Sequence, residues 1–162
     1  MRILGIDPGI GRCGWGVIES QGSKLTVCDF GCIETSSKMQ VPERLQIIYA
    51  EIAKIIKTHK PEALGIEELF FNTNAKTAFV VGQARGVILL VAAQNKLDIS
   101  IYTPLQVKMS LTGYGRAEKG QIGKMVKTLL NLKEIPKPDD TADALAIAIA
   151  HAFSQKYAKL TK

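Results

Sequence analysis

The sequence predicts an α/β fold in which helices flank a five-stranded mixed β-sheet. Short apolar runs at 2–7, 63–67 and 98–102 indicate buried strands, because each is bounded by polar or turn-forming residues and is too short for a helix. Three strands precede the first helical pattern, and helices separate the remaining strands. The resulting order, β-β-β-α-β-α-β-α, favours a sheet with both antiparallel and parallel pairs.

The first three strands are expected to form an antiparallel meander. Residues 2–7, RILGID, are a nearly continuous apolar run that a Pro-Gly turn ends, which fits a strand buried on both faces. The segments 14–19 and 24–34 follow, and Gly22 supplies the turn residue between them. Such closely spaced strands pair as hairpins.

Helices and two parallel strands make up the rest of the predicted chain. Apolar residues recur at spacings of three and four from 41 to 58, which predicts an amphipathic helix. A right-handed crossover through this helix makes the strand at 63–67 parallel to the first strand, and we expect the strand at 98–102 to be parallel as well. The remaining helices are expected at 74–95, 104–111, 118–130 and 139–157.

Length and charge suggest one domain with an acidic partner. The chain has 162 residues, of which 46% are hydrophobic, enough for one core and too few for two full domains. We expect residues 1–162 to form that domain, with 155–162 as a mobile tail. A formal net charge of +6 and a pI near 9.3 favour a polyanionic partner without identifying it.

Cysteine usage and hydropathy predict a soluble cytoplasmic protein with no membrane partner. Cys13, Cys28 and Cys32 are odd in number and lack metal-ligand spacing, as is typical of reduced intracellular thiols. The longest apolar stretch, 87–93, is shorter than the roughly 20 residues of a membrane span. Met1 leads directly into a strand rather than into a signal sequence.

Four acids are expected to converge on one site. Asp7 and Glu67 end two strands predicted to be parallel neighbours, so their carboxylates meet at the carboxyl edge of the sheet, near a topological switch point. Adjacent carboxylates repel unless a cation lies between them. Asp140 and Asp143 are spaced i, i+3 and project from one face of the last helix. Oxygen donors without histidine or cysteine suit Mg²⁺ or Mn²⁺.

Each acid also fits a structural role. Asp7 before Pro-Gly is a common turn former, and Asp139 and Asp140 suit helix capping. Strand alternation allows only one of Glu67 and Glu68 to face the site. The four acids together nevertheless favour a metal-dependent nuclease.

The two histidines argue against a hydrolase with a protein nucleophile. Neither His59 nor His151 lies in a nucleophile motif. His151 is on the same helical face as Asp140 but roughly 16 Å further along the axis. We interpret it as an ordinary helix residue.

Five segments carry a family signature: ILGIDPG (3–9), IEELF (66–70), GQARG (82–86), AEK (117–119) and DDTADALAIAIAHA (139–152). In this order they closely resemble the RuvC family of Holliday-junction resolvases, bacterial members of the RNase H-like superfamily. The resemblance runs from residue 1 to about residue 153. It implies an RNase H-like fold and a homodimeric endonuclease that nicks two strands of a four-way junction symmetrically, in recombination and DNA repair.

The resemblance also assigns the acids. Asp7 and Glu67 match the family's two strand acids, which favours Glu67 over Glu68. Asp140 and Asp143 match the acids of the final helix, and some relatives hold histidine at the first of these positions. The mechanism that these carboxylates can support is two-metal hydrolysis, in which one ion activates water and the other stabilises the leaving 3′ oxygen. We expect Mg²⁺, with Mn²⁺ as a substitute.

Aromatic and basic residues are candidates for junction contacts. Phe70 and Phe71 follow the acid of the fourth strand, where aromatic rings can wedge or stack on unpaired bases. A core position is the alternative, above all for Phe71. Four basic residues are candidates for phosphate contacts, of which the resemblance places the second and fourth near the scissile phosphate: Arg85, Lys108, Arg116 and Lys119.

The helix at 74–95 is a candidate dimer interface. Gly82 and Gly86 each cost about 1 kcal/mol relative to alanine in a helix, which indicates close helix contact, either with the protein's own sheet or with a partner. The resemblance implies that this helix mediates a homodimer and that a RuvA-RuvB branch-migration complex is a partner. Two alternatives remain: an RNase H-like nuclease for structured RNA, and an actin-like-fold nucleotide-binding protein, because IDPGIGRCGWGV (6–17) resembles a phosphate loop.

Overall fold

A mixed sheet forms the centre of the structure, a computed structural model that describes residues 1–68 and 75–160. Its strands are β1 (Arg2–Asp7), β2 (Arg12–Gln21), β3 (Lys24–Glu34), β4 (Ala63–Glu67) and β5 (Asp98–Tyr102). They lie in the order β3-β2-β1-β4-β5. β1 and β3 are antiparallel to β2, whereas β4 is parallel to β1 and β5 to β4. The predicted topology is therefore confirmed.

Strand β2 is longer than the predicted 14–19. Its ladder with β3 extends from Arg12, opposite Glu34, to Gln21, opposite Lys24. Backbone groups pair regardless of side-chain polarity, so the strand continues past its apolar segment. Only two residues then connect the strands, and Gly22 adopts the positive φ of 62° that such a tight hairpin requires.

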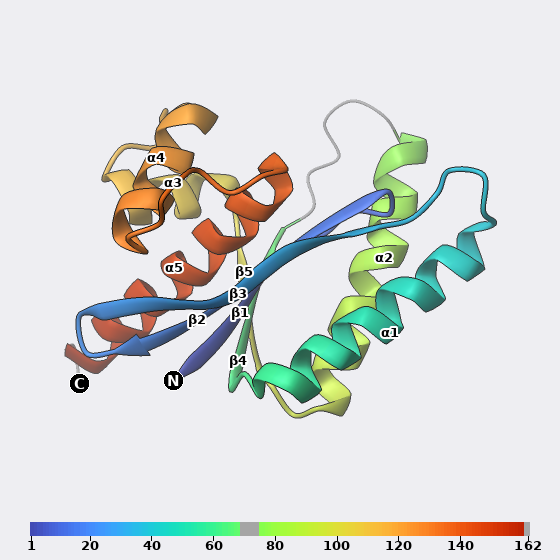
Figure 1. The fold of residues 1–162 in the computed structure, drawn as a ribbon, viewed down its shortest axis with the longest axis horizontal. Helices are drawn as coiled ribbons and strands as arrows, with labels where there is room; N and C mark the ends of the chain where they lie inside the picture. The colour runs from blue at the N-terminus through green and yellow to red at the C-terminus, as the bar shows by residue number, and fades with distance from the viewer. Residues whose placement is uncertain (69–74, 161–162) are drawn as a thin grey trace.

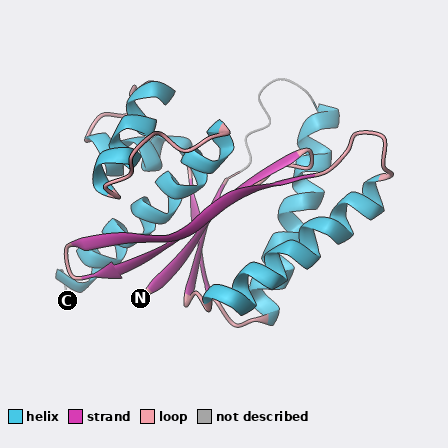
Figure 2. Ribbon diagram, viewed as in Figure 1, coloured by secondary structure: helices cyan, strands magenta, loops and turns pink. Residues whose placement is uncertain are grey.

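Helices cover both faces of the sheet (Figures 1 and 2). One face carries α1 (Val41–His59) and α2 (Ala75–Gln94), and the other carries α3 (Pro104–Thr112), α4 (Lys119–Leu129) and α5 (Asp139–Leu160). Helix α5 continues past the predicted end at residue 157. The part of the expected tail up to Leu160 is therefore helical, and its mobility stays a prediction.

The strand side chains alternate between two cores. On β1, Ile3 packs with α5, whereas Leu4 and Ile6 pack with α1 and α2, and all three are fully buried. Because both faces are covered, β1 needs apolar residues on both, which explains its unbroken apolar run.

Helix α5 lies unusually close to β1 and β2 because glycines face it. A Cβ added at Gly5 would lie 2.1 Å from the carbonyl oxygen of Ala144 and 2.9 Å from the Cβ of Ala148. A Cβ added at Gly16 would lie 2.4 Å from a methyl group of Leu145. The helix backbone therefore rests on the strands with no strand side chain between them.

Helix α2 exposes an apolar face. By length and composition alone, the segment Lys76–Gln94 is apolar enough to span a membrane, and 22% of that window is buried. The uninterrupted apolar run at 87–93 is short, but the mean hydropathy of the wider window is high. Phe79 and Leu90 are exposed by 67% and 53%. A face of this kind also suits a protein partner, and the expectation of no membrane partner stays a prediction.

We predict that Gly5→Ala destabilises the protein by about 3 kcal/mol or more, because the added methyl group meets helix backbone that no rotamer change can move. Chemical denaturation monitored by circular dichroism measures this loss. Gly120→Ala is the matched control, since a Cβ there meets nothing within 4 Å and the change raises helix propensity. Equal stability of the two variants would contradict the close packing of α5.

Candidate active site

The carboxyl ends of β1 and β4 bring two acids together. Ile6 pairs with Ile66 in the parallel ladder, and Asp7 and Glu67 are the next residues on their strands. Both side chains are partly buried. The predicted convergence of Asp7 and Glu67 is therefore present in the structure.

Helix α5 begins directly above this pair. Gly14 is the partner of Asp7 in the β1–β2 ladder, and a Cβ at Gly14 would lie 1.9 Å from the carbonyl oxygen of Asp140. Because Gly14 has no side chain, the first turn of α5 packs directly against β2. Asp140 and Asp143 are thereby brought close enough to raise the pKa of Asp7.

The electrostatics of Asp7 reflect a crowded, poorly hydrated carboxylate. Burial and the neighbouring charges of Glu67, Asp143 and Asp140 raise the pKa of Asp7 from 3.8 to about 8, while Lys119 acts in the opposite direction. Desolvation and like charge both disfavour the ionised form. At neutral pH and without a cation, Asp7 therefore retains a proton.

Glu67 shares this environment. Burial and the charge of Asp143 raise its pKa, whereas a hydrogen bond with Asp7 and the charge of Lys119 lower it. The two carboxyl groups thus share a proton, and the pair titrates as a unit.

Lys119 partly compensates the negative charge. Its Nζ lies 3.1 Å from Oδ2 of Asp143, and this contact raises the pKa of the lysine. Lys119 is the first residue of α4, so the helical layer that contains α5 also brings a cation to the acids.

A cleft of approximately 390 Å³ opens at these residues. Three of the four predicted acids line it, together with two of the predicted basic residues: Asp7, Glu67, Asp143, Lys108 and Lys119. Apolar side chains of α3, α4 and α5 form the remaining wall. A cleft lined by both carboxylates and lysines suits a phosphodiester that binds together with metal ions.

Asp140 lies apart from the cleft lining. Its Oδ2 is buried, accepts no hydrogen bond among the described residues and lies 3.2 Å from Nε of Arg12. Arg12 is the first residue of β2, directly after the loop that follows Asp7, and was not among the predicted site residues. The sequence signal that could have identified Arg12 is its position in IDPGIGR (6–12). A short loop that begins at Asp7 brings the residue at its other end back beside that acid.

Two other predicted contact residues have different surroundings. Nε of Arg85 donates a hydrogen bond of 3.2 Å to the backbone carbonyl of Glu67, so this residue ties α2 to the end of β4. Arg116 is exposed between α3 and α4 and does not line the cleft. Phe70 and Phe71 lie outside the described residues.

The donor set fits hard divalent cations. Among the described residues, the possible ligands that converge here are carboxylates, and their mutual repulsion is the conflict that a cation relieves. Among the described residues, no three His, Cys, Asp or Glu side chains already have the arrangement of a closed metal site. The acids therefore lie around one cleft, but their side chains are not yet arranged as a metal-binding site.

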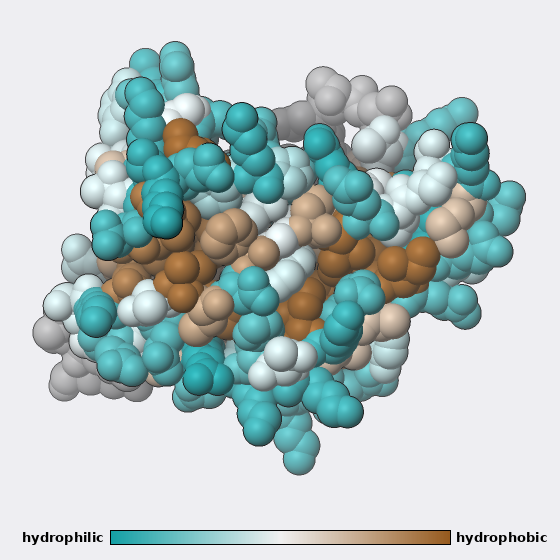
Figure 3. All heavy atoms as spheres, in the orientation of Figure 1, coloured by the Kyte–Doolittle hydropathy of each residue, from teal (hydrophilic) through white to brown (hydrophobic). Residues whose placement is uncertain are grey.

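A second hollow is chemically different. It measures approximately 570 Å³ and lies between β3 and α1, where apolar atoms reach the surface (Figure 3). Trp15 contributes to its lining, and Asp29 there pairs with His59 at 3.4 Å. It contains none of the converging acids.

The raised pKa of Asp7 predicts a pH-dependent stability in chelating buffer. The folded state keeps this proton from about pH 4 to about pH 8, whereas the unfolded state has lost it, so folding stability falls as pH rises through that window. Asp7→Asn removes this loss and should raise the free energy of unfolding at pH 8 by about 1–3 kcal/mol. Denaturation at pH 5 and pH 8 measures the effect.

Glu134→Gln provides the control, because it neutralises an exposed carboxylate outside the site. The prediction fails if Asp7→Asn and the wild type lose the same stability between the two pH values.

Comparisons with known proteins agree with this geometry. The family model of the crossover junction endodeoxyribonuclease RuvC matches residues 3–151. The RuvC protein of Alkaliphilus oremlandii is 55% identical over 162 residues, which cover 100% of this chain and 99% of that protein. The RuvC protein of Caldicellulosiruptor saccharolyticus is 59% identical over 155 residues, or 95% of this chain and 93% of that protein.

A solved structure extends the agreement to the fold. Thermus thermophilus RuvC in complex with Holliday junction substrate superposes with a TM-score of 0.93 at 37% identity, covering 98% of this chain and 96% of that one. This similarity confirms the expected RNase H-like fold. The chain belongs to the RuvC family of crossover junction endodeoxyribonucleases.

Proposed function

We propose that this enzyme resolves Holliday junctions by paired, symmetric nicks in recombination and DNA repair, through metal-dependent hydrolysis of the phosphodiester. The observation that carries the proposal is the convergence of carboxylates from β1, β4 and α5 at a cleft that also presents lysines. The family supports DNA cleavage, and a RuvC relative has been solved with a Holliday junction.

In this proposal the four acids, Asp7, Glu67, Asp140 and Asp143, hold the metal. Two Mg²⁺ ions, or Mn²⁺ in their place, would supply an activated water and would stabilise the charge on the leaving 3′ oxygen. Binding requires Asp7 to release its proton, so metal affinity should increase with pH up to about 8.

The lysines of the cleft act on the substrate. Lys108 and Lys119 place positive charge in the same cleft as the acids, which attracts and orients the phosphodiester. The ammonium group of Lys119 now pairs with Asp143 at 3.1 Å. When cations neutralise that acid, Lys119 becomes available to a phosphate oxygen.

Other residues complete the proposed site. We assign Arg85 to the support of Glu67, because it binds the backbone carbonyl of that acid rather than pointing freely at solvent. Arg116 remains a proposed phosphate contact on the exposed α3–α4 connection. Phe70 and Phe71, next to Glu67 in the sequence, remain the proposed contacts to bases at the junction crossover.

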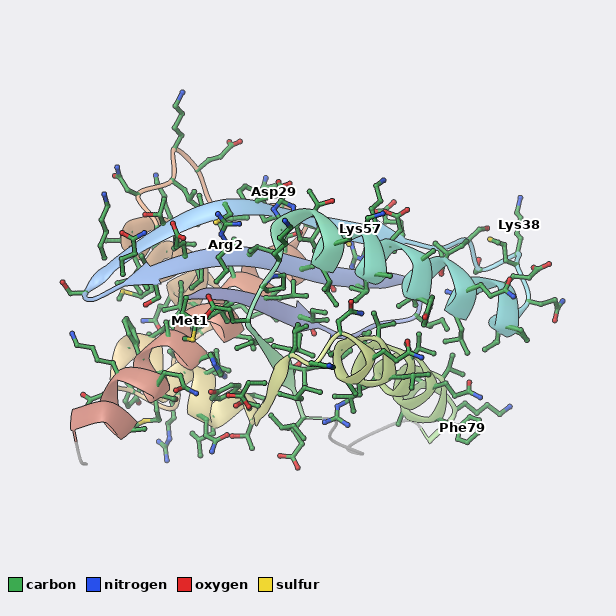
Figure 4. The ribbon with its side chains drawn as sticks, turned by 90° about the horizontal axis from the view of Figure 1, so that it is seen from below. Met1, Arg2, Asp29, Lys38, Lys57 and Phe79 are labelled. Atoms are coloured by element: carbon green, nitrogen blue, oxygen red, sulfur yellow. The ribbon has the colours of Figure 1, made fainter. Side chains whose placement is uncertain are left out.

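Paired nicks require two sites, and we propose that α2 forms the homodimer interface. Phe79 points away from the sheet on the outer side of α2 (Figure 4), and Leu90 extends the exposed apolar face. A two-fold partner on this face would present a second cleft to the symmetric strand of the junction. The family resemblance further supports a RuvA-RuvB-type partner and a cytoplasmic location.

Asp7→Asn should abolish cleavage while junction binding is retained. The substitution removes one proposed metal ligand and leaves the lysines in place, so we expect the rate to fall at least about 100-fold. The experiment compares labelled four-way junction, linear duplex and structured RNA, each with Mg²⁺ and with chelator, and measures binding by gel shift in chelator.

Glu68→Gln is the matched control, because its carboxylate neighbours Glu67 in the sequence but does not line the cleft. Wild-type cleavage by the Asp7 variant, or equal cleavage of junction and linear duplex, would refute the proposal. Preferred cleavage of RNA would instead favour an RNase H-like ribonuclease.

Phe79→Asp should convert the dimer to a monomer, since a charge placed in a dimer interface costs several kcal/mol unless it is paired. Sedimentation at micromolar concentration measures the change. Leu105→Asp, at a side chain exposed by 59% on α3, is the control and should remain dimeric. A monomeric wild type, or loss of the dimer only in the Leu105 variant, would exclude α2 as the interface.

A further inference from the structure

Two polar side chains of α5 are completely buried. Thr141 and His151 have 0% exposure and are the buried polar residues of the part of the chain that the structure describes. Thr141 lies in the first turn of α5, and His151 lies ten residues further along. Both therefore belong to the helix that carries two of the proposed metal ligands.

Each of these side chains binds a different edge of the sheet. Oγ1 of Thr141 donates a hydrogen bond of 3.2 Å to the carbonyl oxygen of Gly31 on β3. Nδ1 of His151 lies 2.9 Å from the hydroxyl group of Tyr102 on β5, with the two rings perpendicular. Because β3 and β5 are the two edge strands, α5 is bound to one edge of the sheet in its first turn and to the other edge ten residues later.

Tyr102 connects this contact to the active site. It pairs with Glu67 in the β4–β5 ladder, and its carbonyl oxygen accepts a hydrogen bond of 2.8 Å from the backbone N–H of Glu68. The hydrogen bond to His151 therefore links α5 to the strand end that carries Glu67.

The rest of this interface is formed by apolar side chains and by backbone. Between the two polar residues, every second residue of α5 is alanine from 142 to 150, and glycines of β1 and β2 face the helix. Leu145, Ile147 and Ile149 alternate with these alanines and are also buried, but apolar contact is non-directional. A shift by one residue moves a helix by about 1.5 Å, whereas catalytic groups must be held within about 0.5 Å.

Burying the polar ring of His151 costs stability, and an apolar residue could occupy the same position. Its Nε2 is buried with no hydrogen-bond partner among the described residues, and burial lowers the pKa of the ring. An apolar residue in this core would avoid that cost. A buried polar group that is only half satisfied is best explained by the directional bond that its other nitrogen makes.

We propose that Thr141 and His151 are positioning residues that fix the axial register of α5 and so hold its acids against those of β1 and β4. Neither side chain lines the cleft, so both act through the helix rather than on the substrate. The catalytic consequence rests on the proposed function, whereas the fixed register does not.

The test uses two changes that each remove one hydrogen bond with little change in volume, Thr141→Val and Tyr102→Phe. We expect the Mg²⁺ concentration for half-maximal junction cleavage to rise about 10-fold in each variant, with unchanged junction affinity in chelator. Thr141→Ser and His151→Asn keep a hydrogen-bonding group and should restore wild-type behaviour. Unchanged Mg²⁺ dependence in both Thr141→Val and Tyr102→Phe would overturn the proposal.

Tyr49→Phe and Thr128→Val are the matched controls. The first loses a hydrogen bond of 2.9 Å to Gln94 on the opposite face of the sheet, and the second loses one of 2.9 Å within α4. Neither should alter the Mg²⁺ dependence. A change in these controls as large as that in the α5 variants would show a general loss of stability and would overturn the proposal.

A second measurement is independent of cleavage. Amide hydrogen exchange of residues 140–146 in the metal-free protein should be faster in Thr141→Val and Tyr102→Phe than in the wild type and controls. If the wild type fails to cut junctions but exchange changes as expected, the proposed function fails and the fixed register stands. If exchange does not change, the register proposal fails whatever the enzyme cleaves.

Discussion

The structure depends on the close approach of α5 to β1 and β2. Gly5, Gly14 and Gly16 leave no side chain between the strands and the helix, so the helix backbone itself forms the contact. This approach places the first turn of α5 beside the end of β1. The same contact therefore builds the core and assembles the acids, and a substitution that moves α5 outward would damage both.

The assembled acids are costly in the absence of cations. Burial and mutual repulsion raise the pKa of Asp7 to about 8, and Lys119 offsets only part of the negative charge. The buried acids thus lower the stability of the cation-free fold, as residues needed for activity commonly do.

The sequence predicted the parts of the site that local patterns determine. Asp7 and Glu67 end apolar strands, and Asp143 follows Asp140 by one helical turn, so strand pairing and helix periodicity predicted these groupings. The choices of Glu67 over Glu68 and of Asp140 over Asp139 rested on the family resemblance. The ion pair between Arg12 and Asp140 was not predictable in this way. It joins residues 128 positions apart, and its formation depends on side-chain geometry within a loop and a helix turn that only the folded chain brings together.

The histidine of α5 shows where pattern analysis stops. Its helical position predicted an ordinary residue distant from the acids. The pattern could not reveal that Tyr102, on a strand about fifty positions earlier, would lie within 2.9 Å of the ring. A rigid helix transmits displacement along its whole length, so a contact two turns beyond Asp143 can determine where that acid lies. The site therefore extends through α5 to the far edge of the sheet.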